Sequence, residues 1–321
     1  MFFIFALLIQ GCSSGNSGND EKTDDFYRQE MRFFVQQISA YSRTMNNTFI
    51  IIPQNGNELV SYDQGDSLLP AIDYLDAIDA VGREDLFYGY NADNQATPAS
   101  ERNYLLDYLD ICLQNHVSVL TTDYCRDHLK MDNSYTLNAS HSFISFAAPE
   151  RELNIIPDYP VPIYNENNED ISTVRDAQNF LYLINPSNFS TTQDLIAAVN
   201  MSNYDLIIID AFFEDILFSS AEISQLKTKY NGTKRLVIAY MSIGEAENYR
   251  YYWQSSWKAG SPDWIVRENP NWEGNFKVKY WNSAWQKIIL GNQSSYLNKI
   301  INAGFDGVYL DIIDAFEYFE N

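Results

Sequence analysis

The stretch GFDGVYLDIIDAF, residues 304–316, holds a short apolar run that ends in an acid. The residues from Gly307 to Leu310 have the composition of a buried β-strand, and Asp311 closes the run. A strand that is apolar along its whole length is typical of a parallel sheet, because helices cover both faces of such a sheet. The stretch therefore predicts a parallel strand that carries a carboxylate to its C-terminal end.

Seven further runs along the chain resemble this one. They are FIIIP (49–53), LFYGY (86–90), VSVLTTD (117–123), FLYLI (180–184), LIIID (206–210), LVIAY (236–240) and FKVKYW (276–281). Eight strands that alternate with helices predict an α/β fold, and about 300 residues suit a single-domain (β/α)8 TIM barrel. A doubly wound open sheet is the alternative, but no glycine-rich phosphate loop follows a strand, which disfavours a nucleotide-binding version.

Helical periodicity lies between several of the runs. Tyr27, Met31, Phe34, Ile38 and Tyr41 recur at spacings of four and three, which is typical of one face of a helix. Further helices are expected in 70–81, 102–115, 191–200, 220–231 and 283–304. FISFAA (143–148) is a ninth apolar run, and the segment 126–175 around it is interpreted as an irregular excursion with a proline-rich surface linker.

The net charge of the chain is −22, from 21 Lys and Arg against 43 Asp and Glu. Nucleic acid is therefore excluded as an expected partner, because phosphate binding needs clustered cations, whereas a neutral or cationic ligand fits this charge. Aromatic residues make up 15% of the chain, with 23 Tyr and 6 Trp. Such rings either fill the core and its rim or stack on sugars, and composition leaves both readings open.

The first 25 residues have a composition unlike that of the rest. MFFIFALLIQGC (1–12) is an apolar run that ends in Cys12, and the segment 13–25 is small and polar. The run is too short to span a bilayer, and its form resembles a bacterial lipoprotein signal whose cysteine receives a lipid. We expect a flexible linker over 13–25, a folded domain over 26–321, and a location in the bacterial cell envelope, lipid-anchored at Cys12, periplasmic or surface-exposed.

The remaining cysteines and the histidines predict no crosslink and no metal. Cys112 falls in an expected helix and Cys125 beyond the far end of the next strand, a separation too large for a disulfide. The three histidines share no ligand spacing, so no metal site and no cofactor are expected. A metal held by carboxylates is the competing interpretation of the acids described next.

Carboxylates follow several of the expected strands. Because chemistry in a (β/α)8 barrel occurs at the C-terminal ends of the strands, we expect these acids to meet at one rim. A single strand-end acid can equally be a helix cap. The acids, with the polar residues next to them, are Asp311, Asp314, Asp210, Asp123, Tyr124, Glu245, Glu247, Asn55 and Glu58. Paired carboxylates can split into an acid and a base, which is the arrangement that glycosidic bond hydrolysis requires.

Four stretches resemble the glycoside hydrolase family 114 proteins. They are AYMSIGEAENYRYYW (239–253), GFDGVYLDIIDAF (304–316), FIIIPQNGNEL (49–59) and FLYLINPSNF (180–189). The resemblance implies a (β/α)8 barrel that hydrolyses α-1,4-linked galactosamine or N-acetylgalactosamine polymers internally, without a cofactor. It implies catalytic roles for Asp311, as nucleophile or base, and for Glu58, as general acid, with the two roles interchangeable.

The same resemblance implies that the barrel is circularly permuted. In the relatives, the stretch corresponding to FLYLINPS opens the domain and the PQNG strand follows GVYLD, whereas here the PQNG strand comes first. The last residue, Asn321, and residues 24–28 are therefore expected to be neighbours on the outside of the barrel. A truncated barrel is disfavoured because eight strands can be counted.

The remaining expected roles concern substrate. Asp210, Glu245, Glu247, Asp123, Tyr124 and Asn55 are expected to line the subsite, and Tyr90, Tyr240 and Trp281 to stack on sugar rings. Arg250 is expected to pair with a rim acid such as Glu247. The partner is then an amino-sugar polysaccharide, with a monomeric protein and membrane contact only through the lipid. The alternatives are a cell-surface lipoprotein that binds glycan without cleaving it, and a metal-dependent hydrolase.

Overall fold

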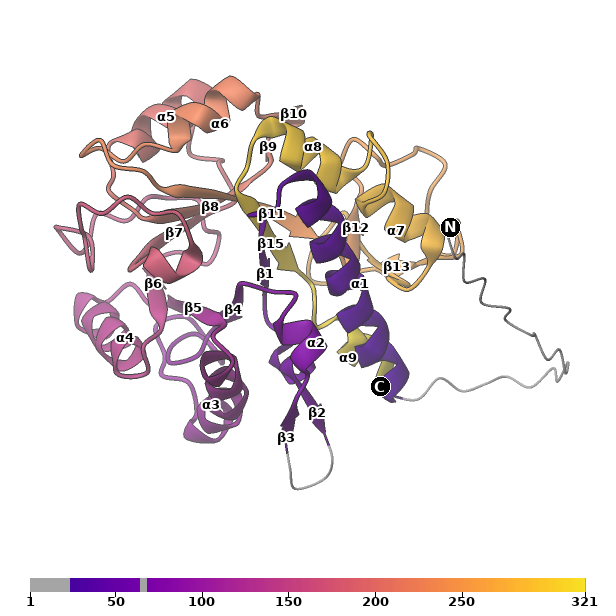
Figure 1. Cartoon of the computed structure of the whole chain (residues 1–321), viewed down its shortest axis with the longest axis horizontal. Coiled ribbons are helices and arrows are strands. Elements are labelled where there is room, and N and C mark those ends of the chain that lie inside the picture. The colour runs from indigo at the N-terminus through magenta and orange to yellow at the C-terminus, as the bar shows by residue number, and fades with distance from the viewer. Residues whose placement is uncertain (1–23, 64–67, 321) are drawn as a thin grey trace, which may run out of the picture.

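The computed structural model describes residues 24–63 and 68–320. Within these residues, eight parallel strands form the centre of the molecule (Figure 1). They are β1 (Ile50–Pro53), β4 (Ala80–Glu84), β5 (Ser118–Tyr124), β6 (Ile144–Ala148), β7 (Phe180–Leu183), β8 (Leu206–Asp210), β11 (Leu236–Ser242) and β15 (Gly307–Asp311). Most of their side chains are fully buried, as their apolar composition predicts.

The parallel strands belong to two hydrogen-bonded sheets. One has the order β1-β15-β11-β8-β7 and the other β4-β5-β6. At one boundary between the sheets, a single parallel bridge joins Gln54, directly after β1, to Gly82 in β4. At the other boundary, β6 lies beside β7, and no ladder of hydrogen bonds joins the two strands in the described residues. The predicted α/β class with a parallel sheet is confirmed, whereas hydrogen bonding does not close the strands into a barrel. We call the β6–β7 boundary the seam.

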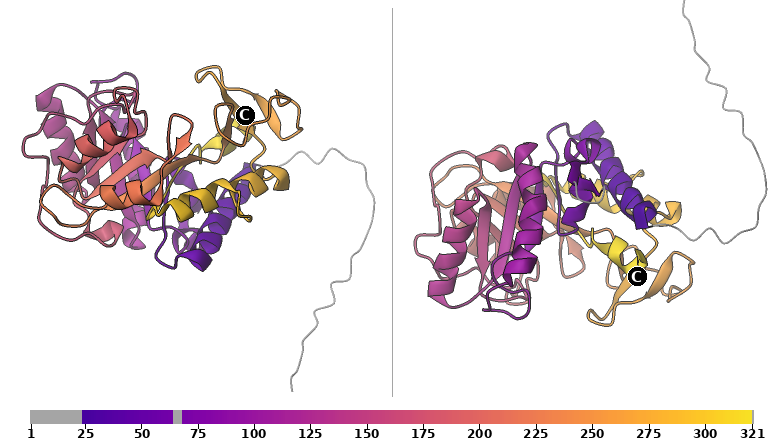
Figure 2. Two further views of the ribbon diagram at one scale, coloured as in Figure 1. Left: turned by 90° about the horizontal axis from the view of Figure 1, so that it is seen from above. Right: turned by 90° about the horizontal axis from the view of Figure 1, so that it is seen from below.

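Helices surround the strands (Figures 1 and 2). They are α1 (Asp24–Met45), α2 (Ile72–Leu75), α3 (Ala99–Gln114), α4 (His128–Ser140), α5 (Thr192–Asn200), α6 (Ser220–Leu226), α7 (Ser283–Ile289), α8 (Tyr296–Ala303) and α9 (Ala315–Glu320), with 3-10 turns η1 (Asn57–Val60) and η2 (Val174–Asp176). In α1, Met31, Phe34, Val35 and Ile38 are fully buried, so the predicted apolar face is the one that packs on the sheet.

Short antiparallel strands occupy the connections. β2 (Ser61–Asp63) pairs with β3 (Leu68–Pro70), and β9 (Phe212–Phe213) pairs with β10 (Ile216–Leu217). Between β11 and α7, β12 (Glu245–Glu247), β14 (Asn275–Val278) and β13 (Ile265–Glu268) form a three-stranded sheet in that order.

Two of the eight expected strands are wrong, and two others take their places. Residues 86–90 form a loop, and the preceding segment Ala80–Glu84 is the strand β4 instead. Within 276–281, the strand β14 belongs to the small antiparallel sheet, while 143–148 supplies β6. The expected excursion 126–175 thus contains a parallel strand and also the helix α4. β4 escaped notice because its sequence, AVGRE, contains a glycine and two charges. Gly82 is needed there because a Cβ would lie 2.8 Å from Cε2 of Tyr309.

The N-terminal helix and the last helix are neighbours, as expected (Figure 2). Nε and Nη2 of Arg28 donate to the two carboxylate oxygens of Glu320 at 2.8 and 3.0 Å. The ring of Tyr27 stacks on Phe319 with centroids 5.4 Å apart. Glu320 thus lies beside residue 28, whereas Asn321, for which the proximity was predicted, and the expected lipidation residue Cys12 lie outside the described residues.

The two cysteines in the described part of the chain, Cys112 and Cys125, are buried free thiols. In the same part, no helix is both long enough and apolar enough to cross a membrane.

Candidate active site

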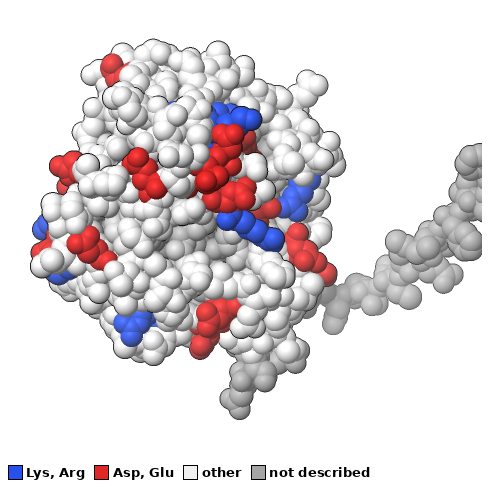
Figure 3. Space-filling view, turned by 60° about the vertical axis from the view of Figure 1, so that its left-hand side comes forward, with Lys and Arg blue, Asp and Glu red and all other residues white. Residues whose placement is uncertain are grey.

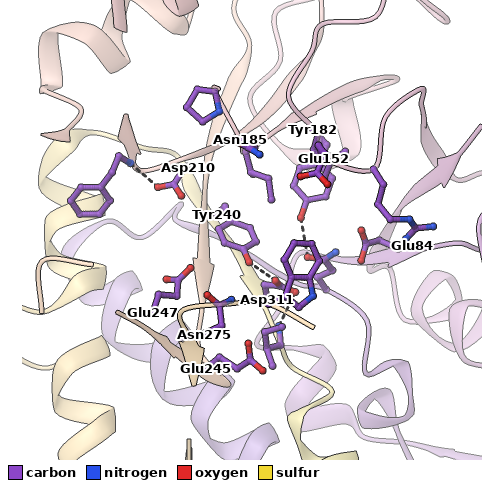
Figure 4. Close-up of a pocket in the computed structure, with 18 of the residues that line it drawn as sticks. Glu84, Glu152, Tyr182, Asn185, Asp210, Tyr240, Glu245, Glu247, Asn275 and Asp311 are labelled. Carbon is purple, nitrogen blue, oxygen red and sulfur yellow. Dashed lines mark hydrogen bonds between the residues drawn. The ribbon is translucent and has the colours of Figure 1, made fainter. Parts of the chain in front are cut away.

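A cavity of about 540 Å³ opens at the C-terminal ends of the parallel strands (Figure 4). Acidic, aromatic and amide side chains from both sheets line it. The polar and aromatic members are Gln54, Asn55, Glu84, Tyr124, Arg151, Glu152, Tyr182, Asn185, Asp210, Phe212, Glu214, Tyr240, Glu245, Glu247, Tyr249, Arg250, Trp272, Asn275, Asp311 and Asp314. The strand ends converge here because all eight strands run in the same direction.

Asp311 lies in this cavity at the end of β15 and is held from two directions. Its Oδ2 accepts a hydrogen bond from the hydroxyl of Tyr240 on the neighbouring strand β11, and its Oδ1 accepts one from the amide of Ile312 at 2.8 Å. Ile312 has φ 58°, a left-handed conformation that costs a β-branched residue strain. Strain directly after a strand-end carboxylate indicates that the position of Asp311 is imposed by its surroundings.

The environment of Asp311 favours its protonated form. Burial raises the pKa of Asp311 to about 8, the Tyr240 hydrogen bond lowers it, and the negative charge of Glu84 raises it further. Asp314, three residues on, also lines the cavity, and burial raises its pKa to about 6. Asp311 therefore carries a proton at neutral pH, and a second acid, at the end of β4, contributes to this effect.

That second carboxylate is Glu84, which closes β4. It accepts hydrogen bonds from the hydroxyl of Tyr124 and from Nδ2 of Asn55, the latter at 3.1 Å. The amide of Glu84 donates to Oδ1 of Asn55 at 3.2 Å, so the Asn55 side chain is held at both ends. Sequence reasoning missed Glu84, because the first residues of β4, Ala80 and Val81, were assigned to an expected helix over 70–81.

Glu58, the expected partner of Asp311, does not line the cavity. After β1 the chain turns through Asn55 and Gly56, both with positive φ, into the 3-10 helix η1. This turn buries Leu59, while the carboxylate of Glu58 accepts a hydrogen bond from the hydroxyl of Tyr104 on α3 at 3.0 Å. The expectation that Glu58 meets Asp311 in the site is therefore corrected, because Asp311 and Glu84 line the cavity and Glu58 does not.

Three further expected site residues lie elsewhere. Asp123 is fully buried behind the strand, where it accepts hydrogen bonds from the amides of Phe87 and Tyr88 and from the side chains of Ser134 and Asn138. Successive strand residues point to opposite faces, so its neighbour Tyr124 reaches the cavity while Asp123 points toward α4.

Tyr90 is exposed outside the cavity, and the ring of Trp281 packs against Tyr27 and Phe319 near the two chain ends. Neither can stack on a sugar inside this cavity. The other expected residues, Asn55, Tyr124, Asp210, Tyr240, Glu245 and Glu247, do line it.

Arg250 connects two of the cavity acids. Its guanidinium donates to both oxygens of Asp210 at 2.8 and 2.6 Å and to both oxygens of Glu247 at 2.7 and 3.2 Å. The predicted pairing with Glu247 is confirmed. Because Arg250 is 7% exposed, this network is rigid, and the hydroxyl of Tyr249 completes it by donating to Glu247 at 2.7 Å.

The cavity is strongly acidic. Eight carboxylates and two arginines line it, and Arg151 forms its ion pairs with Asp85 and Asp93 rather than with the lining acids. Figure 3 shows acidic side chains gathered near the centre of one face of the molecule. Within the described residues, no group of three or more His, Cys, Asp or Glu is arranged to hold a metal ion. The charge favours a cationic ligand.

Three curated relatives match part of the chain. An uncharacterized protein of Deinococcus radiodurans is 42% identical over 130 residues, which are 40% of this chain and 39% of the relative. An uncharacterized protein of Methanocaldococcus jannaschii is 41% identical over 157 residues, 46% of this chain and 43% of the relative. One of Thermotoga maritima is 40% identical over 121 residues, 37% and 36% respectively. The matched segments span less than half the length of these relatives.

A family model matches the second half of the chain. The matched residues run from 166 to 321 and include β7, β8, β11 and β15, and therefore Asp210, Tyr240 and Asp311. Glu84 and Tyr124 come from the strands that precede this segment. Residues 166–321 are thus similar to the Glycoside-hydrolase family GH114.

Proposed function

We propose that this protein is a glycoside hydrolase in which Asp311 and Glu84 are the catalytic acid pair. The observation that carries the proposal is that two carboxylates from two different sheets line one cavity, each held by a tyrosine hydroxyl. Figure 4 shows Asp311 beside Tyr240, with Glu84 on the Tyr182 side of the cavity.

The charge states fit the reaction. A protonated carboxyl gives its proton to the leaving glycosidic oxygen, and an ionised carboxylate acts on the anomeric carbon or on the attacking water. Asp311, whose pKa burial raises to about 8, retains a proton beside the negative charge of Glu84. Asp311 thus supplies the protonated carboxyl, and Glu84 is the residue proposed to act as the second carboxylate.

The proposed substrate is an α-1,4-linked galactosamine or N-acetylgalactosamine polysaccharide, cleaved internally. The support is the similarity of residues 166–321 to a glycoside-hydrolase family together with the acidic cavity, which suits the ammonium groups of a deacetylated amino sugar.

Product analysis with polygalactosamine and its N-acetylated form tests this function. Asp311→Asn and Glu84→Gln should each reduce cleavage by at least a hundredfold, because each removes one of two proton-handling groups. Glu58→Gln is the matched control and should leave cleavage intact, since Glu58 lies outside the cavity. If neither polymer is cleaved by the unaltered protein but both are bound, the protein is a glycan-binding lipoprotein instead.

We also propose that the fold is a circularly permuted (β/α)8 barrel. The eight parallel strands follow one another in chain order through both sheets, β1 pairs in parallel with β15, and α1 contacts α9. A variant that joins residue 320 to residue 24 through a short linker and opens the chain within 157–165 should fold and keep its activity. Failure to fold would count against this arrangement.

Lipidation of Cys12 is a further proposal, which rests on the sequence alone. The full-length protein should fractionate with membranes in a bacterial host, and Cys12→Ala should release it to the soluble fraction. Equal fractionation of the two would reject the anchor.

A further inference from the structure

The small antiparallel sheet β12-β14-β13 carries a loop that reaches the cavity. This loop, residues 269–274, connects β13 to β14, and we call it the Trp272 loop. Trp272 lines the cavity together with Asn275, the first residue of β14. None of its residues was singled out by the sequence as part of the site.

The Trp272 loop is fastened along its length. The amide of Asn269 donates to the carbonyl of Asn275 at 2.7 Å, and the amide of Trp272 donates to the carbonyl of Asn269 at 3.2 Å. Outside the loop, the amide of Asn248 donates to the carbonyl of Gly274 at 2.8 Å. Gly274 has φ 85°, and a Cβ there would lie 2.7 Å from Oδ1 of Asn248. The loop is therefore held in one conformation.

The indole of Trp272 remains uncovered in this rigid loop. Trp272 is 56% exposed, whereas Trp264 and Trp285, whose rings pack against each other, are almost completely buried. An exposed apolar ring of this size does not contribute the free energy of folding that its burial would provide. Its exposure therefore does not stabilise the free protein. An exposed ring carried by a hydrogen-bonded loop at the wall of a cavity is well placed to contact a ligand.

The same loop positions a carboxylate with an unused oxygen. Nδ2 of Asn269 donates to Oε1 of Glu245 at 2.8 Å, and Nζ of Lys277 lies 3.9 Å from the same oxygen. Glu245 is 1% exposed, and its Oε2 is buried without a hydrogen bond of good geometry among the described residues. Burial raises the pKa of this carboxyl, although the nearby Asn275 side chain acts on it and lowers that pKa. A buried carboxylate oxygen without such a bond is costly, and because Glu245 lines the cavity a ligand can relieve that cost.

We propose that Trp272 and Glu245 form a sugar-binding subsite beside the Asp311–Glu84 pair. The indole face stacks on the C–H face of a pyranose ring, and Oε2 of Glu245 accepts a hydrogen bond from a hydroxyl or ammonium group of the same sugar unit. The subsite rests on the proposed function and adds to it, because it holds a unit of the polymer that flanks the bond being cleaved.

Affinity electrophoresis tests the subsite, with polygalactosamine or its N-acetylated form cast in the gel. The full-length protein carrying Asp311→Asn is the reference, so that binding is measured without cleavage. Trp272→Ala in this background should weaken retention about tenfold, which is typical for loss of an interfacial tryptophan. Trp272→Phe should lose less because it keeps an aromatic face, and Glu245→Gln should also weaken binding.

Tyr90→Ala is the matched control, because Tyr90 is a similarly exposed aromatic residue (47%) that lies outside the cavity. Equal retention of the Trp272→Ala and Tyr90→Ala proteins, with both folded by circular dichroism, would overturn the subsite and leave the hydrolase proposal standing if cleavage is observed. If retention depends on Trp272 but the protein with Asp311 intact cleaves neither polymer, the subsite is supported and the hydrolase proposal is refuted. If the reference protein is retained by neither polymer, the subsite is refuted.

Discussion

Replacing Tyr240 by Phe should move the ionisation of Asp311 to higher pH. The Tyr240 hydroxyl donates a hydrogen bond to the carboxylate of Asp311 and thereby lowers its pKa, which burial nevertheless keeps raised at about 8. A hydrogen bond to a charged group contributes about 1.5–3 kcal/mol. One pKa unit corresponds to about 1.4 kcal/mol, so loss of this bond should raise the pKa by about one to two units.

The assay is the pH dependence of kcat/KM, which reports ionisations of the free enzyme. If Asp311 acts ionised, the acidic limb of the profile moves up, and if it acts protonated, the basic limb moves up. The direction of the shift is therefore the same for either role, and the limb that moves identifies the role.

Tyr124→Phe is the control, since it removes a hydroxyl that contacts Glu84 rather than Asp311. It should leave the Asp311 limb in place. An unshifted profile in a folded Tyr240→Phe protein, or a shift to lower pH, would refute the reasoning, because it would mean that this hydroxyl does not stabilise the ionised form of Asp311.

Three further predictions concern stability. Burial raises the pKa of Asp311 to about 8, so the folded protein holds a proton that the unfolded chain releases above about pH 4, and the free energy of unfolding of wild type falls as the pH rises between these values. Relative to wild type, the free energy of unfolding of Asp311→Asn, measured in urea, should therefore rise by on the order of 2 kcal/mol between pH 5 and pH 7. A difference that stays constant over this range would contradict the prediction. Lys229→Met leaves the fully buried carboxylate of Asp205, now 2.8 Å from the ammonium, without its counter-charge and should cost about 3–5 kcal/mol, with partial recovery on adding Asp205→Asn. A double-mutant cycle with Arg28→Ala and Glu320→Gln should give a coupling of about 0.5–1 kcal/mol, and zero coupling would show that the two ends are not held together by this pair.

The sequence predicted the strands whose runs are apolar on both faces. Six of the eight parallel strands follow from such runs, because burial between the sheet interior and the outer helices selects β-branched residues throughout. β4 and β6 were missed for different reasons. AVGRE has too few apolar residues to be distinguished from a loop, and FISFAA lay in a segment whose prolines and acids suggested a surface excursion.

The sequence predicted where the candidate site lies and that it is acidic, but it did not identify all of the residues that line it. Strand-end acids such as Asp311 and Asp210 were found because parallel strands deliver their last residues to one edge. A strand that is apolar on both faces gives no signal of which residues point inward, and so Asp123 was chosen together with its neighbour Tyr124 although the two face opposite ways. Glu84 could be found only by recognising β4. Trp272 could not be found because its loop carries no apolar run or strand-end acid that the sequence pattern would single out.

The seam between β6 and β7 has a dynamic consequence. The edges of β6 and β7 that face each other lack the hydrogen-bond ladder that protects the other parallel strands. Opening at this boundary should therefore cost little free energy, and the amides on these edges should exchange with solvent before those of the rest of the sheet. The chain segments that follow these two strands, with Glu152 and Asn185, form one wall of the cavity, whereas Asp311 sits between two fully laddered neighbours, β1 and β11. Local opening at the seam would thus widen the cavity on the side of Glu152 and Asn185 while Asp311 keeps its position.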